Sequence, residues 1–172
     1  MTLSSTPIVG FALDGVLCPS LPSLPDEKLF WYNRPSLDSE GLSQIGLLSE
    51  VGLILPVFLG KRNDMPGDDP NADYQTLLWL HRHQIIVIKA VDTSEASGIG
   101  LAVILGVQYF LTDRIEDVSG MRRMGIEAFL LTQPQNQKDG TSYRVASIAE
   151  FLEIVQSSHS DPRPENSLGV AA

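Results

Sequence analysis

Five short apolar runs recur along the chain, and helical patterns separate each run from the next. The runs are Ile8–Leu13, Leu53–Leu59, Ile85–Ile88, Val107–Leu111 and Ile126–Leu131. Continuous apolar runs of this length are typical of parallel strands that are covered on both faces. Their alternation with helices predicts an α/β fold, a doubly wound, Rossmann-like parallel sheet with helices on both faces.

The segments between the runs contain residues that begin and end helices. Asp69 followed by Pro70 predicts a helix start, with Leu77, Leu78 and Leu80 along that helix toward His83. Capping-box spacing predicts helices that begin at Asp113 and at Ser147, and Gly125 is placed to end the first of these. Two more helices are expected, one between Ser36 and Val51 and one from Thr93 or Ser94 to near Gly106.

Length and charge limit the organisation and the partners. The 172 residues suffice for about one domain, placed at residues 1–156, and the polar segment 157–172 is expected to be a mobile tail. The net charge of -9 disfavours nucleic acid as a partner. Cys18 is the only cysteine, which excludes an internal disulfide and fits a reducing, cytoplasmic compartment. No signal peptide is recognised, and no apolar run is long enough to span a membrane.

The first apolar run leads into the sequence Phe11-Ala-Leu-Asp-Gly-Val-Leu17. This segment resembles the first motif of the haloacid dehalogenase (HAD) superfamily, in which hydrophobic residues precede Asp-x-Asp-Gly-[Thr/Val]-Leu. Ala12 stands where the family carries its first aspartate, and Asp14 matches the second. The short distance to the next motif is similar to that of small, cap-poor nucleotidase-type members, with only a short flap or cap insertion near residues 18–35.

The later motifs resemble those of the family in their order over roughly residues 7–155, but each lacks one functional group that the family has there. Gly60-Lys61-Arg62 matches the end of the second motif, and Leu59 replaces its hydroxyl residue. Gly98 falls where the third motif has its lysine, and the nearest lysine, Lys89, is displaced. Thr112-Asp113 resembles the acidic pair of the fourth motif, with Thr112 replacing one acid.

The resemblance implies what these substitutions do to the chemistry. In the family the first aspartate attacks phosphorus and binds Mg²⁺, so Ala12 removes a nucleophile and a metal ligand together. We therefore interpret the chain as a catalytically degenerate HAD-like protein, not an enzyme, that needs no cofactor and acts as a binding, regulatory or assembly module. The alternative is a Mg²⁺-dependent phosphatase or nucleotidase, a phosphoric ester hydrolase, in which Asp14 or Asp113 activates water and Lys89 replaces the missing lysine.

The surviving polar residues each have a structural and a functional interpretation. Asp14 is either a residual acid or ligand contact, or a carboxylate that accepts backbone N–H bonds at Gly15. Asp113 is either a weak metal ligand or the cap of the following helix, and Asp117 is interpreted as surface charge. Together with Asp14 and Gly15, the segment Gly60-Lys61-Arg62 is a candidate for binding a small anionic ligand, although it is equally well a solvated loop.

Other residues suggest contacts with partners. Leu29-Phe-Trp-Tyr32 either packs over the sheet edge, which we favour, or forms a lid or a partner-binding patch. A third hypothesis is self-association through this patch or through the sheet edge. Cys18 is expected to be an inert buried residue, and His81 and His83 are expected on different faces of their helix, which disfavours a metal site.

Overall fold

The computed structural model describes residues 5–19, 35–60, 72–93 and 98–160, which build a parallel sheet flanked by helices. The sheet has the order β3-β2-β1-β4-β5-β6, and its neighbouring strands pair in parallel. The strands are β1 (Ile8–Ala12), β2 (Leu55–Leu59), β3 (Ala90–Asp92), β4 (Tyr109–Thr112), β5 (Glu127–Leu131) and β6 (Arg144–Val145). This strand order is that of a doubly wound sheet, so the predicted fold class is confirmed.

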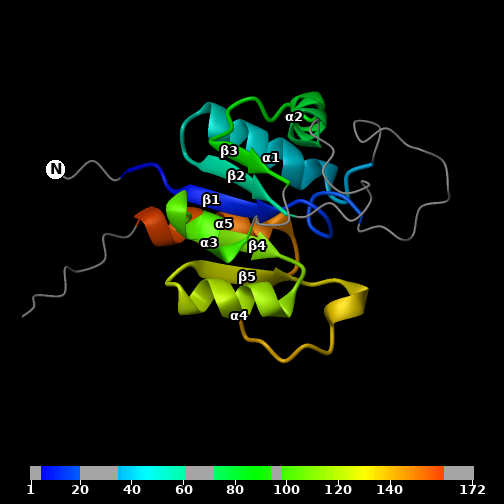
Figure 1. The fold of residues 1–172 in the computed structure, drawn as a ribbon, viewed down its shortest axis with the longest axis vertical. Coiled ribbons are helices and arrows are strands. Elements are labelled where there is room, and N and C mark those ends of the chain that lie inside the picture. Colours follow the sequence, from blue (N-terminus) through cyan, green and yellow to red (C-terminus); the bar gives the residue numbers. More distant parts are fainter. Residues whose placement is uncertain (1–4, 20–34, 61–71, 94–97, 161–172) are drawn as a thin grey trace, which may run out of the picture.

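The helices are divided between the two faces of the sheet (Figure 1). They are α1 (Ser39–Glu50), α2 (Ala72–Arg82), α3 (Ile99–Ile104), α4 (Ile115–Arg123) and α5 (Ile148–Ser160). α1 packs beside α5, and α3 packs beside α4. The crossover from β1 to β2 and the crossover from β4 to β5 run in opposite directions across the sheet. Because such crossovers are right-handed, their helices α1 and α4 lie on opposite faces. Among the described residues, no helix is long and apolar enough to cross a membrane.

Aromatic side chains form the centre of the core beneath β1. The ring of Phe11 stacks on Phe58 of β2, with centroids 5.7 Å apart, and meets Phe151 of α5 edge-on at 5.8 Å. All three side chains are fully buried. Burial of each such side chain stabilises the fold by roughly 1.5–3 kcal/mol. The core therefore holds β1 and β2 rigidly against α5, and with them the carboxyl ends of these strands.

Four helices end in the same backbone motif, in which a left-handed residue follows the helix. After α4, Gly125 N–H bonds to Arg122 O and Ile126 N–H bonds to Met121 O, both within 3.1 Å. Gly125 has φ +82°, so its predicted role as the helix end is confirmed. The equivalent residue after α2 is Gln84, with φ 63°, whereas glycine follows α1 and α3. A side chain in this conformation costs roughly 1–2 kcal/mol, so the turn after α2 is locally strained.

The third predicted strand is corrected, because residues 85–88 are not paired and the strand is β3, at Ala90–Asp92. Ile85 closes the end of α2, where its N–H bonds to Leu80 O at 3.0 Å. Ile86 and Val87 are exposed. An apolar run of four residues cannot by itself distinguish a helix end from a strand.

The predicted helices α1 and α5 are confirmed, and α5 begins with the expected capping pair. Ser147 Oγ accepts from Glu150 N–H at 3.1 Å, and Glu150 Oε2 accepts from Ala146 N–H at 2.6 Å. α5 runs to Ser160, past the domain boundary predicted at residue 156.

The predicted starts of α3 and α4 are wrong. α3 begins after Gly98, and Thr93 instead donates from N–H and Oγ1 to Asp73 Oδ1, at 2.9 and 2.5 Å. Arg114 is the N-cap of α4, and no side chain caps this helix, so the interpretation of Asp113 as its cap is wrong. Asp69, Ser94, the cluster Leu29–Tyr32 and residues 161–172 lie outside the described residues.

Candidate functional site

The carboxyl ends of β1, β2 and β4 meet at one edge of the sheet. The strand register places Ala12 beside Leu59 and Phe11 beside Leu111, so that Thr112 follows at the level of Ala12. Chain crossovers leave β1 and β4 in opposite directions at this point, which is where doubly wound sheets bind ligands. The structure thus brings together the strand ends that the sequence predicted to form the site.

Ala12, Leu59 and Thr112 occupy the three positions at this edge where the sequence resemblance implies an acid or a hydroxyl group. Ala12 is 9% exposed and presents a methyl group, and Leu59 is 2% exposed within the core. Thr112 is fully buried, where its hydroxyl donates to Asp117 Oδ2 at 3.2 Å and accepts from Arg114 N–H at 3.2 Å. Asp117, a charged residue whose side chain is 34% exposed, thus also has a structural contact with Thr112. The Thr112 hydroxyl orders the start of α4.

Asp14 and Gly15 lie in a tight turn directly after β1. The N–H groups of Leu17 and Cys18 both donate to Leu13 O, at 3.0 and 3.2 Å, and Gly15 N–H donates to Cys18 O at 2.8 Å. The Cys18 thiol is fully buried, as predicted, and lies 3.5 Å from Asp14 Oδ1. The turn holds the Asp14 carboxylate at the carboxyl edge, beside the β1–β4 crossover point.

The carboxyl group of Asp113 packs directly against Gly15. A Cβ atom at Gly15 would lie 2.0 Å from Asp113 Oδ2, and Gly15 has φ +82°, so this contact requires glycine. Burial raises the pKa of the Asp113 carboxyl, and the nearby carboxylates of Asp117 and Asp14 raise it further, against the lowering effect of its own backbone N–H and of Arg114. The edge therefore holds a carboxyl group that ionises less readily than a free aspartate.

Asp113→Asn is expected to raise the free energy of unfolding at neutral pH, by less than about 1 kcal/mol because the carboxyl group is partly in water. The contribution of protonated Asp113 to native stability is complete below the pKa that this residue has in the unfolded chain. It is lost as the pH rises through the higher pKa that the residue has in the native state. Asparagine does not titrate, so the gain of the variant should grow with pH across that window. Urea unfolding from pH 4 to pH 8 measures it, and a variant less stable than the wild type at pH 7 would contradict the assignment.

The loop after β5 contributes two residues that the sequence did not reveal, Gln133 and Asn136. Gln133 Nε2 donates to the carbonyl oxygen of Gly15. Asn136 is 3% exposed, and its Nδ2 donates to Asp113 O at 3.0 Å and to Leu131 O at 2.8 Å. Pro134 and the spacing of Gln133 to Asn136 are the sequence signal for the start of this segment's short 3-10 helix, Pro134–Asn136.

The candidate positive charges do not gather at this edge within the described residues. Lys89 precedes β3, and its N–H donates to Pro56 O at 2.9 Å, which places it toward the amino ends of the strands. Lys89 is therefore not placed to replace the missing lysine. Gly98 is the N-cap of α3, and Gly60 N–H bonds to Asp92 O at 3.2 Å at the end of β2. Lys61 and Arg62 lie outside the described residues.

The Mg²⁺ ion that the resemblance implies does not fit the groups at this edge. Magnesium prefers carboxylate oxygens in octahedral geometry, and Ala12 supplies none. In the part of the chain that the structure describes, no three histidine, cysteine, aspartate or glutamate side chains are grouped to hold a metal ion. His81 and His83 lie apart, as predicted: His81 is exposed, whereas the ring of His83 packs 4.4 Å from that of Trp79.

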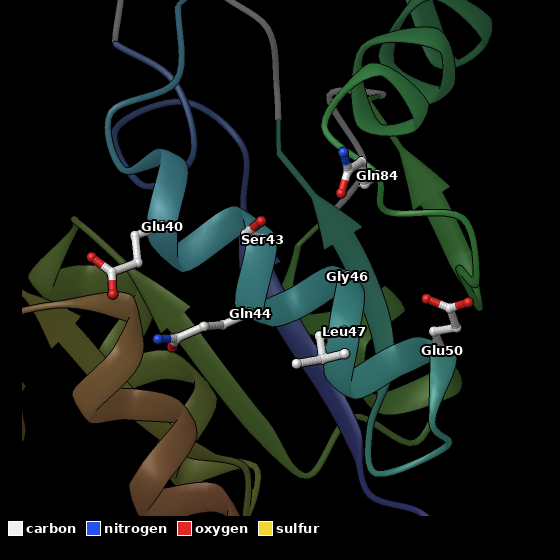
Figure 2. A pocket seen from close by; sticks show the side chains of 7 residues that line it. All are labelled: Glu40, Ser43, Gln44, Gly46, Leu47, Glu50 and Gln84. Carbon is white, nitrogen blue, oxygen red and sulfur yellow. The ribbon is translucent and has the colours of Figure 1, made fainter.

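A surface pocket of about 350 Å³ lies elsewhere, along α1 (Figure 2). Figure 2 shows Gln84, from the strained turn after α2, on one side of this pocket and the exposed side of α1 on the other. A Cβ atom at Gly46 would lie 2.7 Å from Gln84 O, so α1 and this turn pack closely beside the pocket. The pocket contains none of the candidate residues, and we place the candidate site at the carboxyl edge on chemical grounds. Its lining residues are Glu40, Ser43, Gln44, Gly46, Leu47, Glu50 and Gln84.

Comparison with known proteins supports the fold. No protein-family model matches the sequence, and no curated protein matches it. A chain in the structure of the Pnkp1/Rnl/Hen1 RNA repair complex aligns with 76% of this chain at 18% identity and a TM-score of 0.50, and this chain spans 44% of its length. An uncharacterized protein from Corynebacterium glutamicum aligns with 88% of this chain and with 93% of its own length, at 14% identity and a TM-score of 0.43. At such identities the first likeness indicates a Rossmann-like α/β fold alone.

Proposed function

We propose that this chain is a catalytically degenerate, cap-poor member of the HAD-like superfamily that works as a binding, regulatory or assembly module. The observation that carries the proposal is Ala12, which ends the central strand β1 at the β1–β4 crossover point. The family carries its nucleophilic aspartate there, and a methyl group cannot attack phosphorus. The turn Asp14-Gly15, which follows at once, supports the same alignment.

The groups around Ala12 support a loss of the whole reaction rather than of one residue. Phosphoryl transfer needs positive charge and hydrogen-bond donors around the transferring group. Leu59 offers neither, and the hydroxyl of Thr112 is already bound to Asp117 and Arg114. The acidic side chains that remain near the edge, Asp14, Asp113 and Asp117, would repel a phosphate dianion.

A binding role would use the polar groups that are left. The partly buried Asp113 carboxyl, the Asp14 carboxylate and the amide of Gln133 surround the turn at Gly15. These groups suit a neutral or cationic polar ligand, which would donate hydrogen bonds to the carboxylates. An anionic ligand would depend on Lys61 and Arg62 for its positive charge.

The alternative, a Mg²⁺-dependent phosphatase or nucleotidase with an altered mechanism, has less support. It would need Asp14 or Asp113 to activate water and Lys89 to stabilise the developing charge. Lys89 lies toward the amino ends of the strands, away from both carboxylates. A carboxyl group with a raised pKa is suited to accept a proton, but Asp113 would act without a nucleophile beside it, and the nearby cation, Arg114, forms an ion pair with Asp117 at 3.9 Å.

Restoring the carboxylate with Ala12→Asp is expected to produce no phosphatase activity, because Leu59 and Thr112 remain and the lysine is still absent. The measurement is hydrolysis of a generic aryl phosphate with Mg²⁺, over a range of pH, for the wild type and the variant. Thermal unfolding checks that the variant is folded. Metal-dependent turnover by Ala12→Asp alone would show that the rest of the site is competent and would contradict the proposal.

A further inference from the structure

Two aspartate-glycine pairs occur in the sequence, Asp14-Gly15 and Asp139-Gly140. In such a pair the glycine nitrogen can attack the carboxyl carbon of the aspartate, because glycine has no Cβ atom to obstruct the approach. The attack requires the backbone to rotate at the aspartate, so a packed turn prevents it and an open loop permits it. The structure places the two pairs in opposite surroundings.

The first pair is held by the tight turn after β1. Gly15 is buried, its N–H donates to Cys18 O at 2.8 Å, and the Asp113 carboxyl packs against it. Rotation at Asp14 would break the bond to Cys18 and displace Gly15 from its place against Asp113. The lost hydrogen bond costs about 1 kcal/mol, and disturbing the packed turn costs about 1–3 kcal/mol more. The fold therefore protects this pair.

The second pair lies in a partly exposed loop between β5 and β6. Gly140 is exposed, and a Cβ atom there would meet nothing within 4 Å. The Asp139 carbonyl accepts hydrogen bonds from Thr141 N–H, at 3.0 Å, and from Nη2 of Arg144. Bonds of this kind contribute only about 1 kcal/mol each, and no packed turn has to be displaced with them. The Gly140 nitrogen can therefore reach the Asp139 carboxyl group in the native protein.

We propose that Asp139 is a site of spontaneous isoaspartate formation. The Gly140 nitrogen bonds to Asp139 Cγ, and the carboxyl OH leaves with the amide proton as water, which closes a succinimide ring. Water then opens this ring. Attack at Cγ restores aspartate, whereas attack at the main-chain carbonyl carbon gives isoaspartate, in which the chain runs through Cγ. Water is released and then consumed, so the conversion needs no other reactant.

Isoaspartate at this position changes the contacts of the loop. The main chain gains one carbon atom, and the oxygen that accepts from Arg144 becomes part of a free carboxylate, a stronger partner for a guanidinium. Arg144 Nη2 also donates to Asn136 O at 2.6 Å, and Arg144 begins β6. The modified chain is therefore expected to stay folded but to lose the turn at Thr141. The modification alters the loop beside the candidate site and is independent of the chemistry at Ala12, so it extends beyond the proposed function.

Incubation of the full chain for several weeks, at physiological temperature and neutral pH, tests the site. An endoprotease that cleaves before aspartate but not before isoaspartate then digests the protein, and mass spectrometry quantifies the uncleaved peptides. Cleavage before Asp139 is expected to fall with time at unchanged mass. Loss of cleavage before Asp14 should be at least about tenfold slower, since its turn opens less readily. A native protein in which Asp139 stays unchanged, or in which Asp14 reacts as fast, overturns the proposal.

Substitution tests the reacting atoms. Gly140→Ala is expected to slow the conversion of Asp139 at least about tenfold, because the added Cβ atom obstructs the attacking nitrogen. The matched control is Lys138→Ala, on the other side of Asp139, which should leave the rate unchanged. Thermal unfolding checks that both variants are folded. Equal rates in Gly140→Ala and the wild type would contradict attack by this nitrogen.

Unfolding tests the role of the structure separately. Guanidinium chloride releases both pairs from their turns, so Asp14 and Asp139 are expected to convert at similar rates in the denatured chain. The difference between the pairs should return when the denaturant is removed. A difference of the same size in the denatured chain would assign it to the neighbouring sequence and would contradict protection of Asp14 by the fold.

Discussion

Asn136→Ala is expected to lower the free energy of unfolding by about 3 kcal/mol, because it leaves several buried groups without their hydrogen-bond partner. Asn136 Nδ2 donates to Asp113 O and Leu131 O, and its Oδ1 accepts from Gln133 N–H at 2.9 Å. The side chain thereby joins the loops that follow β4 and β5. Its truncation therefore removes three hydrogen bonds at once.

Urea unfolding of the purified variant measures this loss. The matched control is Gln137→Ala, at the neighbouring exposed residue, which should change stability by less than about 0.5 kcal/mol. A loss below about 1 kcal/mol for Asn136→Ala would contradict the role of this amide. Because Asn136 also fixes the backbone of Asp113, the variant should weaken the pH dependence that Asp113 produces.

Gly15→Ala is the second substitution with a large expected effect, again about 3 kcal/mol. Left-handed backbone costs an alanine roughly 1–2 kcal/mol, and Gly15 has φ +82°. The added Cβ atom would also lie 2.0 Å from Asp113 Oδ2 and 2.3 Å from its Cγ, so the carboxyl group must move. Overpacking of this kind typically costs a further 1–3 kcal/mol.

A double-mutant cycle separates the two contributions. In an Asp113→Ala background the clash is gone, so Gly15→Ala should then cost only the backbone strain, about 1–2 kcal/mol. Gly140→Ala is the matched control, since a Cβ atom there would meet nothing within 4 Å. An equal cost of Gly15→Ala in both backgrounds would show that Asp113 does not contact Gly15.

The position of the site could be predicted from the sequence because it follows from the strands. The apolar runs that end at Ala12 and Leu59 indicate parallel strands, and parallel strands bring their carboxyl ends to one edge. The importance of Asn136 could not be predicted, since it arises from contacts with Asp113 and Leu131 that only the folded chain creates.

Two local sequence patterns gave wrong predictions, each for a physical reason. Asp113 and Glu116 have capping-box spacing, but the N-cap of α4 is Arg114, whose N–H bonds to the hydroxyl of Thr112, and the Asp113 carboxyl packs on Gly15 instead. The run Ile85–Ile88 is apolar enough for a strand, but Ile85 closes the end of α2, where its N–H bonds to Leu80 O, and Ile86 and Val87 are exposed.

The most direct test of the central claim is a hydrolysis screen of the wild-type protein against aryl phosphates and nucleotides with several divalent metals. The proposed degenerate site at Ala12 predicts no turnover above the protein-free rate with any metal. Saturable, metal-dependent hydrolysis that Asp14→Asn abolishes would contradict the account, because it would show that this edge of the sheet still performs phosphoryl transfer.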